Sequence, residues 1–132
     1  MTAPTEGDSS VVERTFTPED VRRFADLSGD DQDRHLVPDD EGRHLVQGLL
    51  TATLPTEIGG DNDVLARRME FEFLRPVYTG EPITCEMTTD AVTEYEDRYE
   101  FQSTAICSNE ADETVLTAEI DGLIWKDPAA GV

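Results

Sequence analysis

Alternation of apolar and polar residues dominates the second half of the chain. Between residues 64 and 77, Met69, Phe71 and Phe73 alternate with charged side chains. Because successive side chains of a β-strand point to opposite faces, this spacing predicts a strand. The same pattern predicts three further strands, over residues 83–93, 97–107 and 114–125. The last of them carries apolar residues on both faces, which is typical of a strand inside a sheet.

Apolar residues recur at helical spacing in the first half of the chain. Thr17 and Pro18 predict a helix start, because Thr17 can cap the helix and proline suits its first position. Gly29 predicts the end of this helix. A second, largely buried helix is predicted over residues 42–58, with Pro55 kinking it or ending it early.

The predicted elements follow the order strand (residues 10–16), helix, polar loop (residues 31–41), helix and four strands. This order predicts an α+β architecture with a helix lying in a curved, mostly antiparallel sheet. At 132 residues we expect one domain, residues 9–127, with a flexible tail at 1–8 and a short tail at 128–132. Because five strands leave sheet edges to protect, pairing between two copies is expected.

The chain is strongly acidic, with 30 acidic and 10 basic residues, a formal net charge of −20 and a pI near 4.1. Such a charge repels phosphate backbones and anionic membrane surfaces, so neither nucleic acid nor membrane is an expected partner. Since no apolar run approaches a membrane span and no secretory signal is visible, we expect a cytoplasmic protein.

The source of the chain is also suggested by its charge. Only Lys126 is a lysine, and an excess of Asp and Glu with so little lysine is expected where molar salt screens repulsion. The sequence therefore predicts an extreme halophile as the host. An ordinary acidic cytosolic protein is the alternative.

One polar stretch, residues 28–35 (Ser-Gly-Asp-Asp-Gln-Asp-Arg-His), points to chemistry. It holds a carboxylate, Asp30, and an imidazole, His35, five residues apart after a helix. Such a pair can bind one water, with the carboxylate accepting a proton and the imidazole exchanging another with a reacting atom. The alternative is structural, with Asp30 ending the helix and His35 on the surface.

This stretch resembles the motif Ser-Gly-Asp-x-Asn-Pro-x-His of the MaoC-like (R)-specific enoyl-CoA hydratases. The preceding helix start, Phe-Thr-Pro-Glu-Asp-Val at residues 16–21, is also similar. Gln47-Gly48 is similar to the family's His-Gly at a helix start. Residues 73–81, Phe-Leu-Arg-Pro-Val-Tyr-Thr-Gly-Glu, resemble its Phe-x-x-Pro-Val-x-x-Gly-Asp strand. The resemblance runs over about residues 8–125.

The resemblance implies a hotdog fold, in which a long central helix is wrapped by the sheet and two copies join their sheets as a homodimer. It implies reversible hydration of trans-2-enoyl-CoA to (3R)-3-hydroxyacyl-CoA, with no metal or redox cofactor. Asp30 and His35 would hold and activate the water, in roles of base and acid that stay open. The Gly48 N–H would stabilise the thioester oxyanion. The residues implied as a supporting shell are Ser28, Gly29, Gln32 and Gln47.

The chain departs from the family pattern close to this pair. Gln32-Asp33 replaces Asn-Pro, so a rigid turn and a short amide are lost. Gln47 replaces the histidine, and the stretch between His35 and Gly48 looks shorter than is usual for the family.

Two rival functions follow. A hotdog acyl-CoA thioesterase would use Glu57 or Asp30 to activate water. A non-catalytic acyl-CoA-binding protein would result if the altered turn disables the site.

Further residues could contribute to the site. Arg67, Arg68 and Arg75 could contact coenzyme A phosphates, or could instead pair with neighbouring acids such as Glu70 and Glu72.

His44, at the start of the predicted central helix, could face the same cleft, but we expect it to face solvent or cap that helix. The histidines lack metal-ligand spacing, so no metal site is predicted. Cys85 and Cys107 lie on apolar strand faces and are expected to be buried structural thiols.

Overall fold

Five antiparallel strands form a single open sheet in the computed structural model of the chain, which describes residues 3–127 and 129. The strand order is β1-β3-β4-β5-β2, which leaves β1 and β2 at the edges. The strands are β1 (Ser9–Thr15), β2 (Leu65–Phe73), β3 (Pro82–Glu94), β4 (Arg98–Ser108) and β5 (Thr114–Trp125). The predicted strands and their antiparallel pairing are confirmed.

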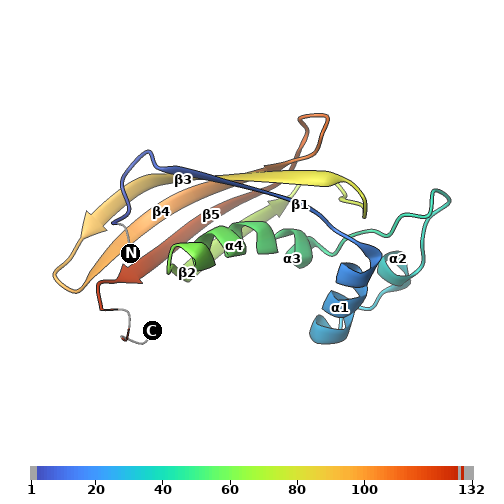
Figure 1. Ribbon diagram of the computed structural model, residues 1–132, viewed down its shortest axis with the longest axis horizontal. Helices are drawn as coiled ribbons and strands as arrows, with labels where there is room; N and C mark the ends of the chain where they lie inside the picture. The colour runs from blue at the N-terminus through green and yellow to red at the C-terminus, as the bar shows by residue number, and fades with distance from the viewer. Residues whose placement is uncertain (1–2, 128, 130–132) are drawn as a thin grey trace.

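Four short helices accompany the sheet. They are α1 (Pro18–Ser28), α2 (Asp33–Leu36), α3 (Gly48–Thr51) and α4 (Thr53–Asp61). The sheet arches over α3 and α4, while α1 and α2 lie beyond one end of it, away from the end where the chain begins (Figure 1). None of the helices in the described part of the chain is long and apolar enough to cross a membrane.

The core lies between the inner face of the sheet and helices α3 and α4. Every second residue of β4 from Phe101 to Cys107 is buried, as the alternation predicts. Leu54 and Ile58 of α4 pack into the same core. The ring of Phe101 in β4 packs against Gly122 in the neighbouring strand β5. A Cβ added at Gly122 would lie 2.8 Å from this ring. Glycine therefore allows this close approach.

Helix α1 forms as its local signals predict. Thr17 caps it in a reciprocal capping box with Asp20, and Pro18 occupies the first helical position. Gly29 ends it in a left-handed conformation, with φ of 79°, and its N–H donates to the Ala25 carbonyl at 2.9 Å. This C-terminal glycine fixes where the chain leaves α1 toward Asp30.

The predicted long helix over residues 42–58 is wrong at its start. The helix begins at Gly48, and it is divided at Ala52 into α3 and α4 before continuing to Asp61. The division has a local cause, because Pro55 has no N–H to donate to the carbonyl of Thr51.

Residues 44–46 are extended because their backbone pairs with another extended segment, residues 77–79. The Val46 N–H donates to the Val77 carbonyl at 2.8 Å, and the Thr79 N–H donates to the His44 carbonyl at 2.9 Å. The apolar spacing of Leu45 and Val46 therefore belongs to this short bridge and not to a helix.

Part of the segment predicted as a tail, residues 1–8, makes defined hydrogen bonds. Thr5–Asp8 form a hydrogen-bonded turn, in which the Asp8 N–H donates to the Thr5 carbonyl at 3.0 Å and Gly7 adopts a positive φ of 90°. The Gly7 N–H also donates to the Thr89 carbonyl at 2.8 Å, which fastens the turn to β3. Residues 1–2, and residues 128 and 130–132 of the predicted C-terminal tail, lie outside the described residues.

Candidate active site

The residues expected to form a polar loop, 31–41, contain the short helix α2, and this helix carries His35 inward. His35 is only 5% exposed, so the alternative interpretation, in which His35 is a surface residue, is wrong. Its ring atom Nδ1 lies 2.7 Å from the backbone carbonyl oxygen of Leu45. Because a carbonyl can only accept, Nδ1 carries the proton, and a neutral ring presents a lone pair at Nε2.

A second histidine supports this arrangement. The Nδ1–H of His44 donates to the backbone carbonyl of His35, with 2.7 Å between the heavy atoms. His44 itself is held by its backbone N–H, which donates to the Thr79 hydroxyl at 3.0 Å. The expected role of His44 at a helix start is therefore wrong, since it lies in the extended bridge and fastens α2 to it.

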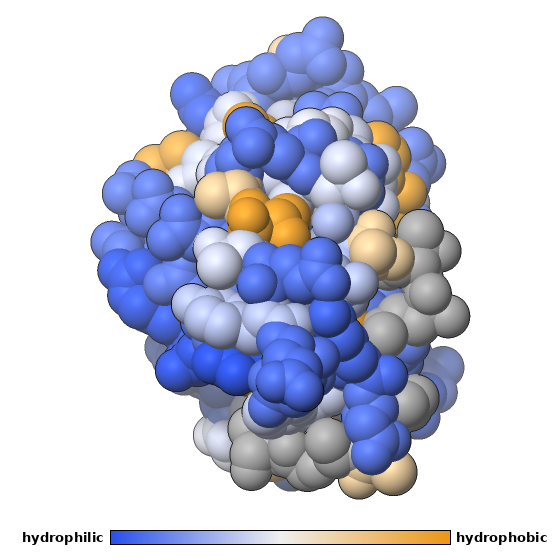
Figure 2. Space-filling view, turned by 90° about the vertical axis from the view of Figure 1, so that its left-hand side faces the viewer, coloured by the Kyte–Doolittle hydropathy of each residue, from blue (hydrophilic) through white to orange (hydrophobic). Residues whose placement is uncertain are grey.

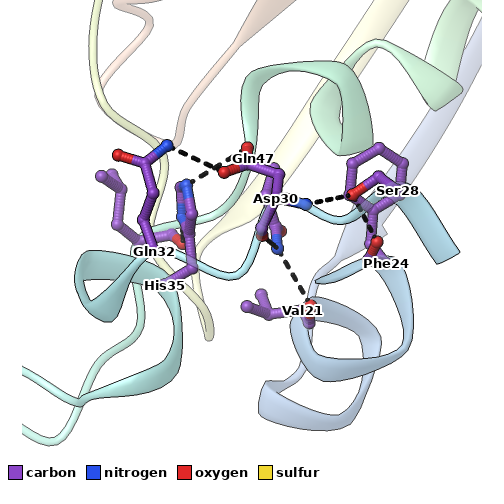
Figure 3. A network of polar contacts seen from close by, with 8 residues as sticks. Val21, Phe24, Ser28, Asp30, Gln32, His35 and Gln47 are labelled. Carbon is purple, nitrogen blue, oxygen red and sulfur yellow. Dashed lines mark hydrogen bonds and ion pairs between the residues drawn. The ribbon is translucent and has the colours of Figure 1, made fainter. Parts of the chain in front are cut away.

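Asp30 faces the free side of the His35 ring (Figure 3). Its Oδ2 lies 3.5 Å from Nε2 of His35, and its side chain is 38% exposed. This distance is long for a direct hydrogen bond, and with a neutral ring both atoms are acceptors. A water molecule can donate one hydrogen bond to each of them. The oxygen of a water held in this way keeps its lone pairs unshared.

The predicted supporting residues Ser28 and Gln32 do surround Asp30. The Ser28 hydroxyl accepts from the Asp30 N–H at 3.0 Å and donates to the Phe24 carbonyl at 2.6 Å. The Gln32 amide donates to Oδ1 of Asp30 at 2.8 Å. Although the short amide of the family motif is absent, the longer Gln32 side chain donates an amide hydrogen bond to Asp30. Because this bond occupies Oδ1, Oδ2 is the oxygen that faces His35.

Gln47 links three parts of the site from a buried position, with only 1% of its surface exposed. Its amide donates to the carbonyl of Val21 in α1 at 3.0 Å and lies 3.5 Å from the backbone carbonyl of Asp30. Its own carbonyl oxygen is buried without a hydrogen-bond partner among the described residues. Gln47 therefore ties α1 and the Asp30 backbone to the residue before Gly48.

Gly48 and His35 both open onto a groove of about 400 Å³. Gly48 is the first residue of α3, where a backbone N–H has no partner inside the helix. A Cβ at this position would lie 2.8 Å from the ring of Phe73, so glycine allows this ring to lie as close to α3 as it does. The remaining lining is mostly apolar and includes Leu45, Val46, Thr51, Leu74, Pro76, Val77, Val115 and Leu116.

The three candidate arginines do not share this groove. Arg75 lines it, donates to the Thr114 carbonyl at 2.6 Å and pairs with Glu113 at 3.5 Å. Arg67 and Arg68 line a separate hollow of about 540 Å³ near the other end of β2. They pair there with acidic side chains, Arg67 with Glu100 at 3.1 Å and Arg68 with Glu70 at 2.6 Å. Only Arg75 is brought to the same groove as His35 and Gly48.

Other candidates lie outside the groove. Glu57 is ion-paired with Arg14 and is not one of the residues that line it. Cys85 and Cys107 face each other across β3 and β4 and are fully buried, as expected of structural thiols. A hydrogen bond with Cys85, together with burial, raises the pKa of the Cys107 thiol, which disfavours a nucleophilic thiolate. The described residues contain no group of three or more His, Cys, Asp or Glu side chains placed to hold a metal ion.

Sequence reasoning proposed Asp30, His35 and Gly48 as site residues but not the residues that hold or border them, above all Leu45 and Phe73. Leu45 acts through its backbone carbonyl, for which its side chain gives no signal. Phe73 belongs to a motif that was recognised, but its contact with Gly48 depends on how β2 and α3 meet in three dimensions.

Comparison with known proteins identifies the fold. No protein-family model matches the sequence, and no curated protein matches it either. Among solved structures, an (R)-hydratase from A. caviae involved in PHA biosynthesis superposes with a TM-score of 0.80 at 22% identity, over 94% of this chain and 98% of that one. The chain has the hotdog fold.

Further hotdog-fold structures agree with this identification. The MaoC-like dehydratase from Rhodospirillum rubrum gives a TM-score of 0.75 at 19% identity, covering 92% of this chain and 93% of that one. A (3R)-hydroxyacyl-ACP dehydratase complex from Mycobacterium tuberculosis gives 0.65 at 16% identity, covering 93% and 99%. The hotdog fold predicted from the motif resemblance is thus confirmed, although two short helices stand where one long helix was expected.

Proposed function

We propose that this hotdog protein catalyses the reversible hydration of trans-2-enoyl-CoA to (3R)-3-hydroxyacyl-CoA. The observation that carries the proposal is the 3.5 Å separation of Asp30 Oδ2 and His35 Nε2, since His35 lines an apolar groove together with Gly48. The solved structures similar to this chain include proteins named (R)-hydratase and MaoC-like dehydratase, which supports the same reaction class.

In the proposed reaction, one water is held by Asp30 and His35. His35 Nε2 takes a proton from this water while Asp30 keeps the other O–H oriented. The water oxygen bonds to C3 of the substrate, and the C2=C3 electron pair moves through C2 and C1 to the thioester oxygen, giving an enolate. The imidazolium then returns its proton to C2, so that the sum is addition of one water across the double bond.

Gly48 is proposed to stabilise the enolate oxygen. Its N–H is the first of a helix and has no acceptor within that helix, and the positive end of the helix dipole favours a developing negative charge there. A positioned donor of this kind contributes about 3 kcal/mol to transition-state stabilisation. No metal or redox cofactor is needed in this scheme, because every proton and electron pair is accounted for by water, substrate and His35.

The partners we propose are the acyl-CoA substrate and a second copy of the chain. Arg75 is the arginine best placed to contact a coenzyme A phosphate, since it lines the groove. The edge strand β2 exposes Met69 by 37% and Phe73 by 53%, and pairing of two β2 edges in a homodimer would cover these side chains. A coenzyme A substrate also fits a cytoplasmic protein.

The proposal is tested by turnover of crotonyl-CoA in molar KCl, followed as loss of the enoyl absorbance. We expect (3R)-3-hydroxybutyryl-CoA as the product, which chiral analysis identifies. A thiol reagent in a parallel assay detects free coenzyme A. Release of coenzyme A without hydration would indicate a thioesterase, and a ligand-induced rise in thermal stability without turnover would indicate a binding protein.

A further inference from the structure

The groove beside His35 ends at a floor of closely packed side chains. Val115 and Leu116 of β5 line it and are 2% and 1% exposed. Directly across the sheet from Leu116 lies Cys107, and across from Cys107 lies Cys85. Both cysteines, and Leu54 of α4 in the same core, are 0% exposed.

This packing closes the space between the sheet and α4. A channel wide enough for an alkyl chain would let a water-sized sphere touch its walls, and the side chains beside it would then show some exposure. Leu54 on the helix side and Cys85 and Cys107 on the sheet side show none. An acyl chain that enters past Gly48 therefore cannot continue along α4 beyond Leu116.

The volume of the groove leads to the same limit. At roughly 30 Å³ per water-sized group, the groove of about 400 Å³ holds roughly a dozen non-hydrogen atoms. The thioester carbon, oxygen and sulfur and the two reacting carbons are already five of these atoms. Only a few further carbons fit in contact with the apolar wall.

We propose that this site selects short-chain enoyl thioesters, of about four to six acyl carbons, and that Leu116 sets the limit. The inference rests on the proposed hydratase function, but the closed floor also predicts how saturated acyl-CoAs bind. Burying one more methylene normally raises affinity about fourfold. We expect this gain from four to six carbons and no further gain from six to ten.

The test measures two series on the full-length protein in molar KCl. The first is kcat/KM for trans-2-enoyl-CoAs of four, six, eight and ten carbons. The second is the Kd of the matching saturated acyl-CoAs by calorimetry, which needs no turnover. Affinity that levels off or falls beyond six carbons supports the proposal, even if hydration is not found. Affinity that rises about fourfold per methylene up to ten carbons overturns it, whether or not the protein is a hydratase.

A pair of variants tests the role of Leu116. Leu116→Ala deepens the groove and should move the preferred length by about two carbons. Ile120→Ala removes a buried side chain on the same strand and face, at a position that does not line the groove, and should leave the preference unchanged. Leu116→Val makes a smaller change in case the alanine variant does not fold. A folded Leu116 variant with the wild-type chain-length profile would show that Leu116 does not set the limit. So would an equal shift in preferred chain length in the Leu116→Ala and Ile120→Ala variants.

Discussion

The Nδ1–H of His35 donates to the backbone carbonyl of Leu45 across 2.7 Å, and this contact decides which ring nitrogen is free to act. With Nδ1 occupied, Nε2 is the atom that faces Asp30 at 3.5 Å. The Leu45 carbonyl is itself fixed, because residues 44–46 pair with residues 77–79. The chemistry proposed for the site therefore depends on a short bridge of extended backbone that carries no catalytic side chain.

Asp30→Asn and His35→Ala should each lower kcat with crotonyl-CoA by 10²–10⁴-fold, the usual contribution of a general acid or base. Asp30→Asn keeps the size of the side chain but supplies a poorer, uncharged hydrogen-bond acceptor for the O–H of the held water. Asp31→Asn is the matched control, since it removes a neighbouring exposed carboxylate and should leave kcat within about twofold of wild type. Circular dichroism checks that each variant is folded. Full activity in either Asp30→Asn or His35→Ala would rule out the proposed mechanism.

Gln32 should act as a positioning residue for Asp30, because its amide donates to Oδ1 at 2.8 Å. We expect Gln32→Ala to lower kcat about tenfold with little change in KM, since the carboxylate loses its fixed rotamer while the groove is untouched. Gln32→Glu should cost more, because its carboxylate repels that of Asp30. The kcat and KM values of both variants, measured side by side, provide the test.

A loss confined to KM would instead assign Gln32 to substrate binding. Wild-type activity in both the alanine and the glutamate variant would show that the contact with Asp30 has no part in turnover. Since Gln32 is exposed, neither substitution is expected to change thermal stability by more than about 0.5 kcal/mol.

Local sequence signals predicted α1 and the strands, and distant pairing explains most of what was missed. Thr17 and Gly29 fix the ends of α1 through contacts within four residues, so the sequence shows them directly. The start of α3 depends on residues 44–46 pairing with a segment more than thirty residues away. No periodicity within 42–58 distinguishes that bridge from a turn of helix.

The same difference between local signals and distant contacts applies to the candidate site. The spacing of Asp30 and His35 is visible in the sequence, and so is the glycine at position 48. Burial of His35 depends on α2, which lacks the side-chain cap that marks α1. The different surroundings of Arg68 and Arg75 could not be predicted, because both fall within the single strand predicted over residues 64–77. In the structure Arg68 lies in β2 and Arg75 lies beyond its end, and the two line different hollows.

Gly48→Ala should lower kcat at least tenfold, because a Cβ would lie 2.8 Å from the ring of Phe73, and either this ring, which lines the groove, or the start of α3 must shift. The double variant Gly48→Ala with Phe73→Ala relieves this clash and should recover most of the loss. Phe73→Ala alone is the reference for the double variant, so that kcat for all four proteins completes a double-mutant cycle. If the double variant is no better than Gly48→Ala, the contact with Phe73 is not the reason for glycine at this position.

The KM for acyl-CoA should fall as KCl rises from low to molar concentration. The chain has a net charge of −20 and coenzyme A is a polyanion, so protein and substrate repel each other in dilute buffer. One face of the molecule is mostly hydrophilic around a small apolar patch (Figure 2), which agrees with a strongly charged surface. Because the Debye length is about 3 Å at 1 M salt, this repulsion is then screened. Initial rates at fixed KCl concentrations give the dependence, with sucrose at equal osmolality as the control for non-ionic effects. A KM that rises with KCl would show that attraction at Arg75 outweighs the net charge, since salt weakens attraction and repulsion alike.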